Sequence, residues 1–159
     1  MKALSGRQPW WWAILATNLA SPKRIENRED CSSARQQMKR YRGPLLLHAS
    51  AGCTRGECVE ALDSMIGQGL ISYMDWPGLK SVPRGGVCGR ARVVGLITPD
   101  GDPYDFEARE AIARYKPDMR WHARGQWGHI LADVEPLPFV AVKGKLGLFE
   151  VEWPRRETA

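Results

Sequence analysis

Alternating and continuous apolar stretches along the chain predict several short β-strands. Residues 45–50 (LLLHAS) are a brief, nearly continuous apolar run, which is typical of a buried strand. Residues 86–98 alternate between two faces, and their glycines would permit bulges or barrel curvature. We also expect strands at residues 1–7, 24–28, 127–134 and 146–153, with a break at residues 136–138 (PLP).

Helical spacing appears between these strands. Thr54-x-x-Glu57 is a capping-box sequence, so a helix should start there and end at the glycines of residues 67–69. The apolar stripe expected to face the core is Val59, Leu62 and Ile66. Other helices are expected at residues 106–115 and after Pro9, whereas the polar residues 29–40 predict a surface loop with a possible short helical turn.

Strands with interspersed short helices indicate an α+β fold in which the sheet closes into a small β-barrel. With 159 residues, the chain is long enough to bury a sizeable core without disulfides or metals. We expect a single domain over residues 1–153, followed by a polar tail at 154–159 that frays.

Charge is distributed unevenly along the chain, whose formal net charge is +5. Residues 1–43 hold nine Lys/Arg and three Asp/Glu, a surplus of six, whereas residues 44–159 hold fourteen and fifteen. This basic segment favours a polyanionic partner, because phosphate contacts dominate nucleic-acid affinity. The alternative is a basic soluble protein with no such partner.

The four cysteines lie at positions 31, 53, 58 and 88, and no two of them are spaced as C-x-x-C. No zinc site and no other cofactor is therefore expected. Without a secretory context they indicate reduced thiols and a cytoplasmic protein. The apolar run of residues 10–16 is only seven residues long, rich in Trp and preceded by Pro9, so a signal peptide is not expected. It is too short for a membrane span, and no membrane partner is expected.

Charged and polar residues that could take part in binding or catalysis are concentrated in residues 21–28 (SPKRIENR). If this stretch is extended, Glu26 and Arg28 share one face, and Lys23 lies at the strand entrance behind Pro22. A carboxylate between two cations stays ionised. Such a cluster could bind a phosphate, a base edge or a carbonyl, and the alternative is a salt-bridged strand on a solvated face.

Two further groups offer chemistry. His48 and Ser50 would point to the same side of their strand, which suggests a nucleophile pair, although no orienting acid lies nearby and a hydrogen-bonded structural histidine is the alternative. The side chains of residues 10–12 (WWW) lie about 100° apart around a helix, so they cannot all face one core. At least one should face a groove or solvent, where a base could stack on it.

Several segments together resemble the ASCH (activating signal cointegrator homology) family of PUA-like β-barrels. Residues 3–10 (ALSGRQPW) resemble the family opening, and residues 23–28 match its K-x-x-E-N-R signature. Residues 41–50 (YRGPLLLHAS), 127–134 and 143–149 resemble further family strands. The resemblance extends from residue 3 to about residue 152, and it is loose over residues 51–126. Ser21 stands where the signature has glycine.

The resemblance implies a cleft that binds RNA, another single-stranded nucleic acid or a modified nucleoside. Cations would hold phosphate, and Trp10 or Tyr41 would stack a base. The predicted nucleic-acid-binding residues are Arg7, Gln8, Trp10, Lys23, Arg28, Tyr41, Arg42 and Ser50.

The alternative function is that of a metal-independent hydrolase, since relatives in this family include ribonucleases and amidohydrolases acting on N4-acetylcytidine. In that case the predicted catalytic residues are Lys23, Glu26 and His48. Lys23 would stabilise developing negative charge, and Glu26 or His48 would act as a base or activate water. The amidohydrolase branch has a threonine at the position of Glu26.

Overall fold

The computed structural model describes residues 1–29 and 33–154, with side chains described from residue 36 onward in the second range. It is a mixed α+β fold, as predicted. Its strands are β1 (Lys2–Gly6), β2 (Ile25–Arg28), β3 (Gly43–Ala49), β4 (Gly86–Ile97), β5 (Trp127–Ala141) and β6 (Leu148–Glu150). Its helices are α1 (Trp10–Leu15), α2 (Ser33–Arg40), α3 (Arg55–Gly67) and α4 (Phe106–Tyr115), with 3₁₀ turns at Tyr73–Asp75, Leu79–Ser81 and Met119–Trp121.

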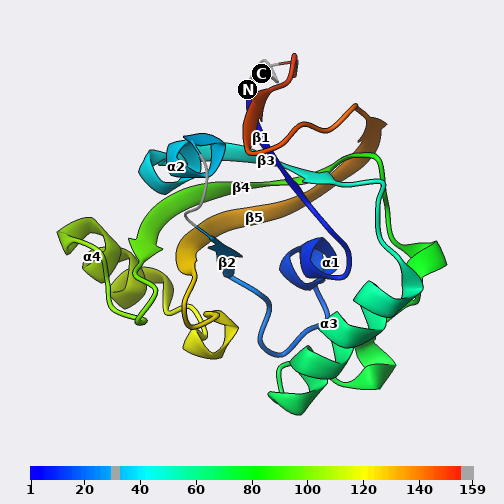
Figure 1. The fold of residues 1–159 in the computed structure, drawn as a ribbon, viewed down its shortest axis with the longest axis horizontal. Coiled ribbons are helices and arrows are strands. Elements are labelled where there is room, and N and C mark those ends of the chain that lie inside the picture. The colour runs from blue at the N-terminus through cyan, green and yellow to red at the C-terminus, as the bar shows by residue number, and fades with distance from the viewer. Residues whose placement is uncertain (30–32, 155–159) are drawn as a thin grey trace.

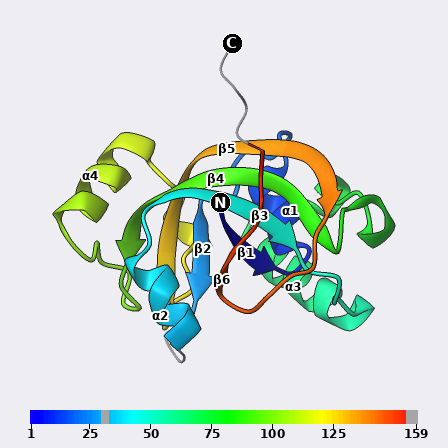
Figure 2. The ribbon, with the colours of Figure 1, turned by 90° about the horizontal axis from the view of Figure 1, so that it is seen from above.

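Within the described residues the strands form a six-stranded sheet in the order β2-β5-β4-β3-β1-β6. The pairing is antiparallel except between β1 and β3. Register shifts along β4 and β5 bend these long strands. The sheet therefore curls into a half-barrel, in which β4 and β5 form the top of the arch (Figures 1 and 2). This shape is compatible with the small barrel predicted from the sequence.

Helix α1 lies in the hollow of the curled sheet (Figure 2). Trp11 and Ile14 are fully buried there and pack with leucines of β1 and β3. Met38 of α2 joins the same cluster, so α2 covers another part of the core. Helices α3 and α4 lie at opposite sides of the molecule (Figure 1).

Helix α3 has the predicted capping box, since the Thr54 hydroxyl accepts from the Glu57 amide while the Glu57 carboxylate accepts from the Thr54 amide. The predicted core stripe, however, is wrong at Val59, which is 47% exposed. The buried side chains are Cys58, Ala61, Leu62 and Met65. Leu62 thus faces the core as predicted, Ile66 is partly buried against it, and Cys58 takes the inward position expected of its neighbour Val59.

Two other boundaries differ from the prediction. The polar residues predicted as a loop contain helix α2 rather than a single turn, because Met38 anchors one face of it in the core; residues 30–32 lie outside the described residues. Strand β5 continues through residues 136–138. Strand β2 pairs only with residues 127–130, so the later half of β5 has no neighbouring strand on that side in the part of the chain that the structure describes. Proline is tolerated at such an edge because its missing N–H would have no strand partner there.

The last strand is also shorter than predicted, since β6 covers three residues. Phe149 and Val151, two residues apart, are nonetheless both buried. No helix among the described residues has the length and apolar character to cross a membrane. Pro154 is exposed, and residues 155–159 of the predicted tail lie outside the described residues.

Candidate functional site

Strand β2 and the residues just before it bring together the three charged residues singled out in the sequence. The Lys23 ammonium donates to Oε2 of Glu26 at 2.5 Å, and Nη2 of Arg28 lies 2.9 Å from Oε1 of the same carboxylate. Glu26 and Arg28 share one face of the strand, as predicted. Lys23 is 2% exposed and Glu26 6% exposed. The alternative of a salt-bridged strand on a solvated face is therefore wrong.

The approach to β2 is tied to helix α1, which explains how a lysine comes to be buried. The backbone N–H of Lys23 donates to the carbonyl of Ala13 at 3.0 Å. The Arg24 guanidinium donates to the carbonyl of Ile14 at 2.8 Å, at the end of α1 where carbonyls lack helical partners. These bonds hold Lys23 beneath α1, with its ammonium directed at Glu26.

Burial and charge act in opposite directions on this cluster. Burial lowers the pKa of Lys23, while the Glu26 carboxylate acts to raise it. Burial by itself raises the pKa of Glu26, but the charges of Lys23 and Arg28 outweigh it, and the pKa lies below its ordinary value. Glu26 is thus held as a carboxylate with a cation at each oxygen.

Two adjoining cavities open beside this cluster, and we call them together the Lys23 cleft. The inner cavity, of about 220 Å³, reaches Lys23 and Ala123. The outer cavity, of about 490 Å³, is more open to solvent and reaches Arg7 and Arg28. Residues lining both are Trp10, Glu26, Asn27 and Gln126. The ion-paired cluster therefore lies at the floor of a cleft of ligand size.

The three adjacent tryptophans have separate environments. Trp11 is fully buried, and its indole N–H donates to the carbonyl of His48 at 2.6 Å. Trp12 packs edge-on against Trp76, with ring centroids 5.0 Å apart. Trp10 is half-buried and lines the Lys23 cleft, where the Lys23 ammonium lies 6.0 Å from its ring centroid. The prediction that at least one tryptophan faces a groove is confirmed.

Arg28 also connects two strands that do not pair with each other. Its Nη2 donates to the carbonyl of Ser5 in β1 at 2.9 Å, and its guanidinium lies 5.7 Å from the Trp11 ring centroid. The side chain is thus held in place across the hollow of the sheet while still lining the outer cavity. A preorganised arginine of this kind loses little conformational entropy when it binds a ligand.

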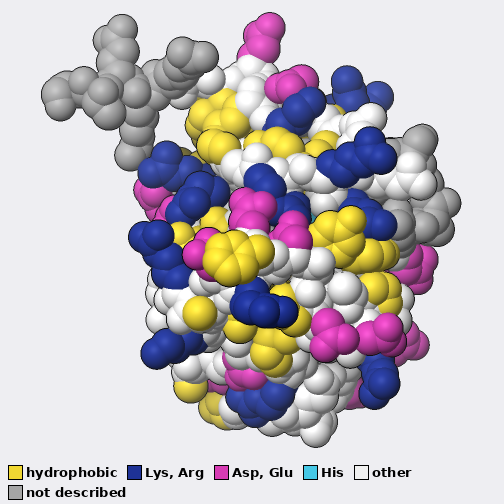
Figure 3. Space-filling view, turned by 90° about the vertical axis from the view of Figure 1, so that its left-hand side faces the viewer, with side chains coloured by type: hydrophobic (Ala, Val, Ile, Leu, Met, Phe, Trp, Pro, Cys, Tyr) yellow, Lys and Arg dark blue, Asp and Glu magenta, His cyan; other side chains and the backbone are white. Residues whose placement is uncertain are grey.

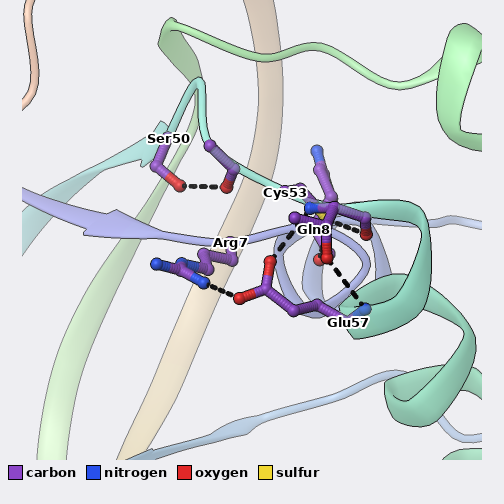
Figure 4. Close-up of polar contacts among 7 residues, drawn as sticks. Arg7, Gln8, Ser50, Cys53 and Glu57 are labelled. Atoms are coloured by element: carbon purple, nitrogen blue, oxygen red, sulfur yellow. Dashed lines mark hydrogen bonds and ion pairs between the residues drawn. The ribbon is translucent and has the colours of Figure 1, made fainter.

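Arg7 and Gln8, adjacent in sequence, have different surroundings. Arg7 is exposed and forms an ion pair with Glu57 of α3 at the rim of the cleft (Figure 4). Gln8 is buried: its Oε1 accepts from the Trp12 N–H and its Nε2 donates to the carbonyl of Pro83, both at 2.9 Å. Gln8 does not line either cavity of the cleft, and it positions the start of α1.

His48 and Ser50 lie outside the Lys23 cleft. Nε2 of His48 lies 2.7 Å from the carbonyl of Val142, which can only accept, so Nε2 carries the proton and Nδ1 accepts from the Ser5 hydroxyl at 2.8 Å. The Ser50 hydroxyl donates to the carbonyl of Gly52 at 3.3 Å (Figure 4). Both ring nitrogens are therefore hydrogen-bonded, which agrees with the alternative of a hydrogen-bonded histidine.

Tyr41 and Arg42 belong to another surface. The Tyr41 hydroxyl donates to the carbonyl of Pro44, and the Arg42 guanidinium donates to the carbonyl of Tyr41 at 2.8 Å. Arg42 lines a cavity of about 440 Å³ between α2 and α4, which is separate from the Lys23 cleft. On this side of the molecule Lys and Arg are interspersed with Asp and Glu (Figure 3). The two residues are therefore not brought together with Lys23.

Sequence reasoning missed two residues of the site. His129 of β5 pairs directly with Glu26, is 1% exposed, and its Nδ1 has no hydrogen-bond partner among the described residues. Burial lowers the pKa of His129 to about 3, so the ring is neutral near pH 7. Asn27 donates to the carbonyl of Trp121 and accepts from the N–H of Ala123, each at 2.8 Å, and so holds one wall of the cleft. The K-x-x-E-N-R motif contains Asn27, but nothing local indicated His129.

Comparisons with known proteins leave the family open: neither protein-family models nor curated proteins give a match to this chain. The described residues contain no cluster of three or more His, Cys, Asp or Glu side chains arranged to hold a metal ion. Three cysteines, Cys53, Cys58 and Cys88, are free thiols, in agreement with the prediction, and Cys31 lies outside the described residues.

Proposed function

We propose that this chain is a nucleic-acid-binding protein of the ASCH family with a PUA-like barrel, and that single-stranded RNA or a flipped nucleotide enters the Lys23 cleft. The family proposal rests on the motifs of residues 3–10, 23–28 and 41–50, and the curled sheet is compatible with it. The observation that carries the functional proposal is the buried Lys23–Glu26–Arg28 cluster on the floor of a cleft walled by Trp10.

The inner cavity suits a base better than a phosphate. Its floor carries the Glu26 carboxylate, which can accept from an exocyclic amine on a base edge. Trp10 offers an aromatic face of the kind that stacks on bases. Because Lys23 already neutralises Glu26, the floor presents little net positive charge for a phosphate.

The outer cavity suits the sugar and phosphate. Arg28 and the exposed Arg7 line it, and the basic excess of the chain lies within residues 1–43. Charged side chains at the mouth of a cleft steer anionic ligands and contact phosphates. Reduced thiols at the three described cysteines fit a cytoplasmic location for such a protein.

A hydrolase is the second candidate, and the enclosed position of Lys23 and Glu26 is the observation that favours it. Glu26 would then activate water while Lys23 stabilised an oxyanion. Two observations favour binding instead. Both Glu26 oxygens already carry a cation, and the pKa of Glu26 is lowered, which makes it a weak base near neutral pH.

The test is incubation with a panel of RNA oligonucleotides and with N4-acetylcytidine, with binding measured by fluorescence anisotropy and products identified by mass spectrometry. We expect binding without cleavage or deacetylation. With about three to five phosphate contacts, log K should fall against log salt with a slope of roughly −2 to −4. Cleaved RNA or released acetate would establish the hydrolase, and no binding at low salt would refute both candidates.

A further inference from the structure

Helix α3 begins between two cysteines whose positions bring their side chains together. Thr54 is the N-cap residue, so Cys53 occupies the position before the cap and Cys58 the fourth position of the helix. These two positions pack against each other in the hydrophobic-staple arrangement, which fixes the angle at which a chain enters a helix. Here both members of the staple are thiols.

The observed contacts agree with that geometry. The thiol of Cys53 is half-buried and donates to the carbonyls of Gln8 at 3.2 Å and Thr54 at 3.5 Å (Figure 4). Cys58 is buried but lines a cavity of about 200 Å³ beside α3. Burial and the nearby Cys53 thiol raise the pKa of Cys58. Cys53 packs against the hydrophobic cluster that contains Cys58, so the two side chains lie close together in the folded protein.

Cys88 provides an internal contrast. It lies within strand β4, is buried, and donates to the carbonyl of Leu47 at 3.5 Å. Burial raises the pKa of Cys88 to about 11, so it contains very little thiolate near neutral pH. Cys53 is the most accessible of the three described thiols, and it is the one with a second cysteine beside it.

We propose that Cys53 and Cys58 are a modification site, at which a small disulfide oxidant such as glutathione disulfide forms a reversible intramolecular disulfide. The Cys53 thiolate attacks one sulfur of the oxidant, which forms a mixed disulfide and releases one glutathione thiolate. The Cys58 thiolate then attacks the Cys53 sulfur and releases the second glutathione. The two cysteines lose two protons and two electrons, and glutathione disulfide is reduced to two glutathione thiols.

Oxidation would change the contacts at the start of α3. The Cys53 sulfur would no longer donate a hydrogen to the carbonyl of Gln8, the residue that positions α1. A covalent bond would instead tie the loop before Thr54 to the first turn of the helix. The loop residues 51 and 52 are exposed, so the chain can adjust there to the geometry that a disulfide requires.

The test uses the folded full-length chain, incubated in buffers of defined reduced and oxidised glutathione and quenched with N-ethylmaleimide. Trypsin cuts after Arg55, which separates the two cysteines into peptides 43–55 and 56–80. We expect these peptides to remain joined after oxidation, with a mass two hydrogens below their sum, and to separate after dithiothreitol. Cys88 should carry neither glutathione nor a disulfide in the same sample.

A variant and a peptide test the roles of Cys58 and of the fold. Cys58→Ala should stop at a glutathione adduct on Cys53, because the resolving thiol is absent. A synthetic peptide of residues 50–61 should require an oxidised-to-reduced ratio at least about tenfold higher than the protein, because only the fold holds the thiols together. Persistent glutathione on Cys53 in the wild-type protein, or equal oxidation of peptide and protein, would overturn the proposal.

Discussion

Replacing Glu26 by glutamine should strongly destabilise the fold, because it leaves the Lys23 ammonium buried beside an uncharged amide. The carboxylate lies 2.5 Å from Lys23 and 2.9 Å from Arg28. Removing one partner of a buried ion pair typically costs about 3 to 5 kcal/mol. Arg28 keeps the Ser5 carbonyl and some solvent contact, so we expect the lower end, about 3 kcal/mol. For a domain of this size, that lowers Tm by about 6 to 12 °C.

The assay is thermal and urea unfolding followed by circular dichroism. Glu150→Gln is the matched control: Glu150 also contacts two cations, Lys2 and the N-terminal amine, but it is exposed, so Tm should hardly change. The double variant Lys23→Met/Glu26→Leu removes both fully buried charges and should recover part of the loss, because Arg28, the cation that remains, is partly exposed and keeps the Ser5 carbonyl.

RNA affinity of Glu26→Gln, measured well below its Tm, reports on function separately from stability. If Glu26 orients Lys23 and Arg28 for binding, affinity should fall by about 1 to 2 kcal/mol, since a charge-assisted contact becomes a neutral one. Two results would refute the reasoning: a Tm of Glu26→Gln within about 1 °C of wild type, or a double variant less stable than Glu26→Gln.

Three further predictions concern other parts of the chain. The pKa of His129 is about 3 in the folded protein, whereas the histidine of the unfolded chain takes up its proton near pH 6.5. The unfolding free energy should therefore fall by about 1.4 kcal/mol per pH unit on acidification from about pH 6 to 4. In urea titrations, His129→Asn should reduce this dependence on pH. Trp10→Ala should weaken RNA binding by about 1 to 3 kcal/mol in anisotropy titrations while Trp10→Phe retains most of it, and equal affinity in all three proteins would exclude stacking. Leu62→Ala should cost about 2 to 5 kcal/mol in urea unfolding, whereas Val59→Ala should change stability by less than about 1 kcal/mol, and the reverse order would contradict the observed face of α3.

Local sequence was sufficient where one element determines the outcome. Side chains alternate along an extended strand whatever its neighbours, so residues 24–28 alone placed Glu26 and Arg28 on the same face. The capping box of α3 and the bounds of α4 were likewise predicted, because hydrogen bonds and side-chain spacing within these helices define them.

Partners distant in the chain decided the remainder. Lys23 is buried because α1 folds over it, and His129 faces Glu26 because β2 pairs with β5 across about a hundred residues. The later half of β5 remains a strand despite its prolines, because β2 is too short to pair with it and no hydrogen bond from the proline nitrogens is required there. Burial and pairing are properties of contacts between elements. Residue spacing within a single element therefore indicated the candidate cluster, while only the tertiary structure decided that it is buried, enclosed by Trp10 and accompanied by a neutral histidine.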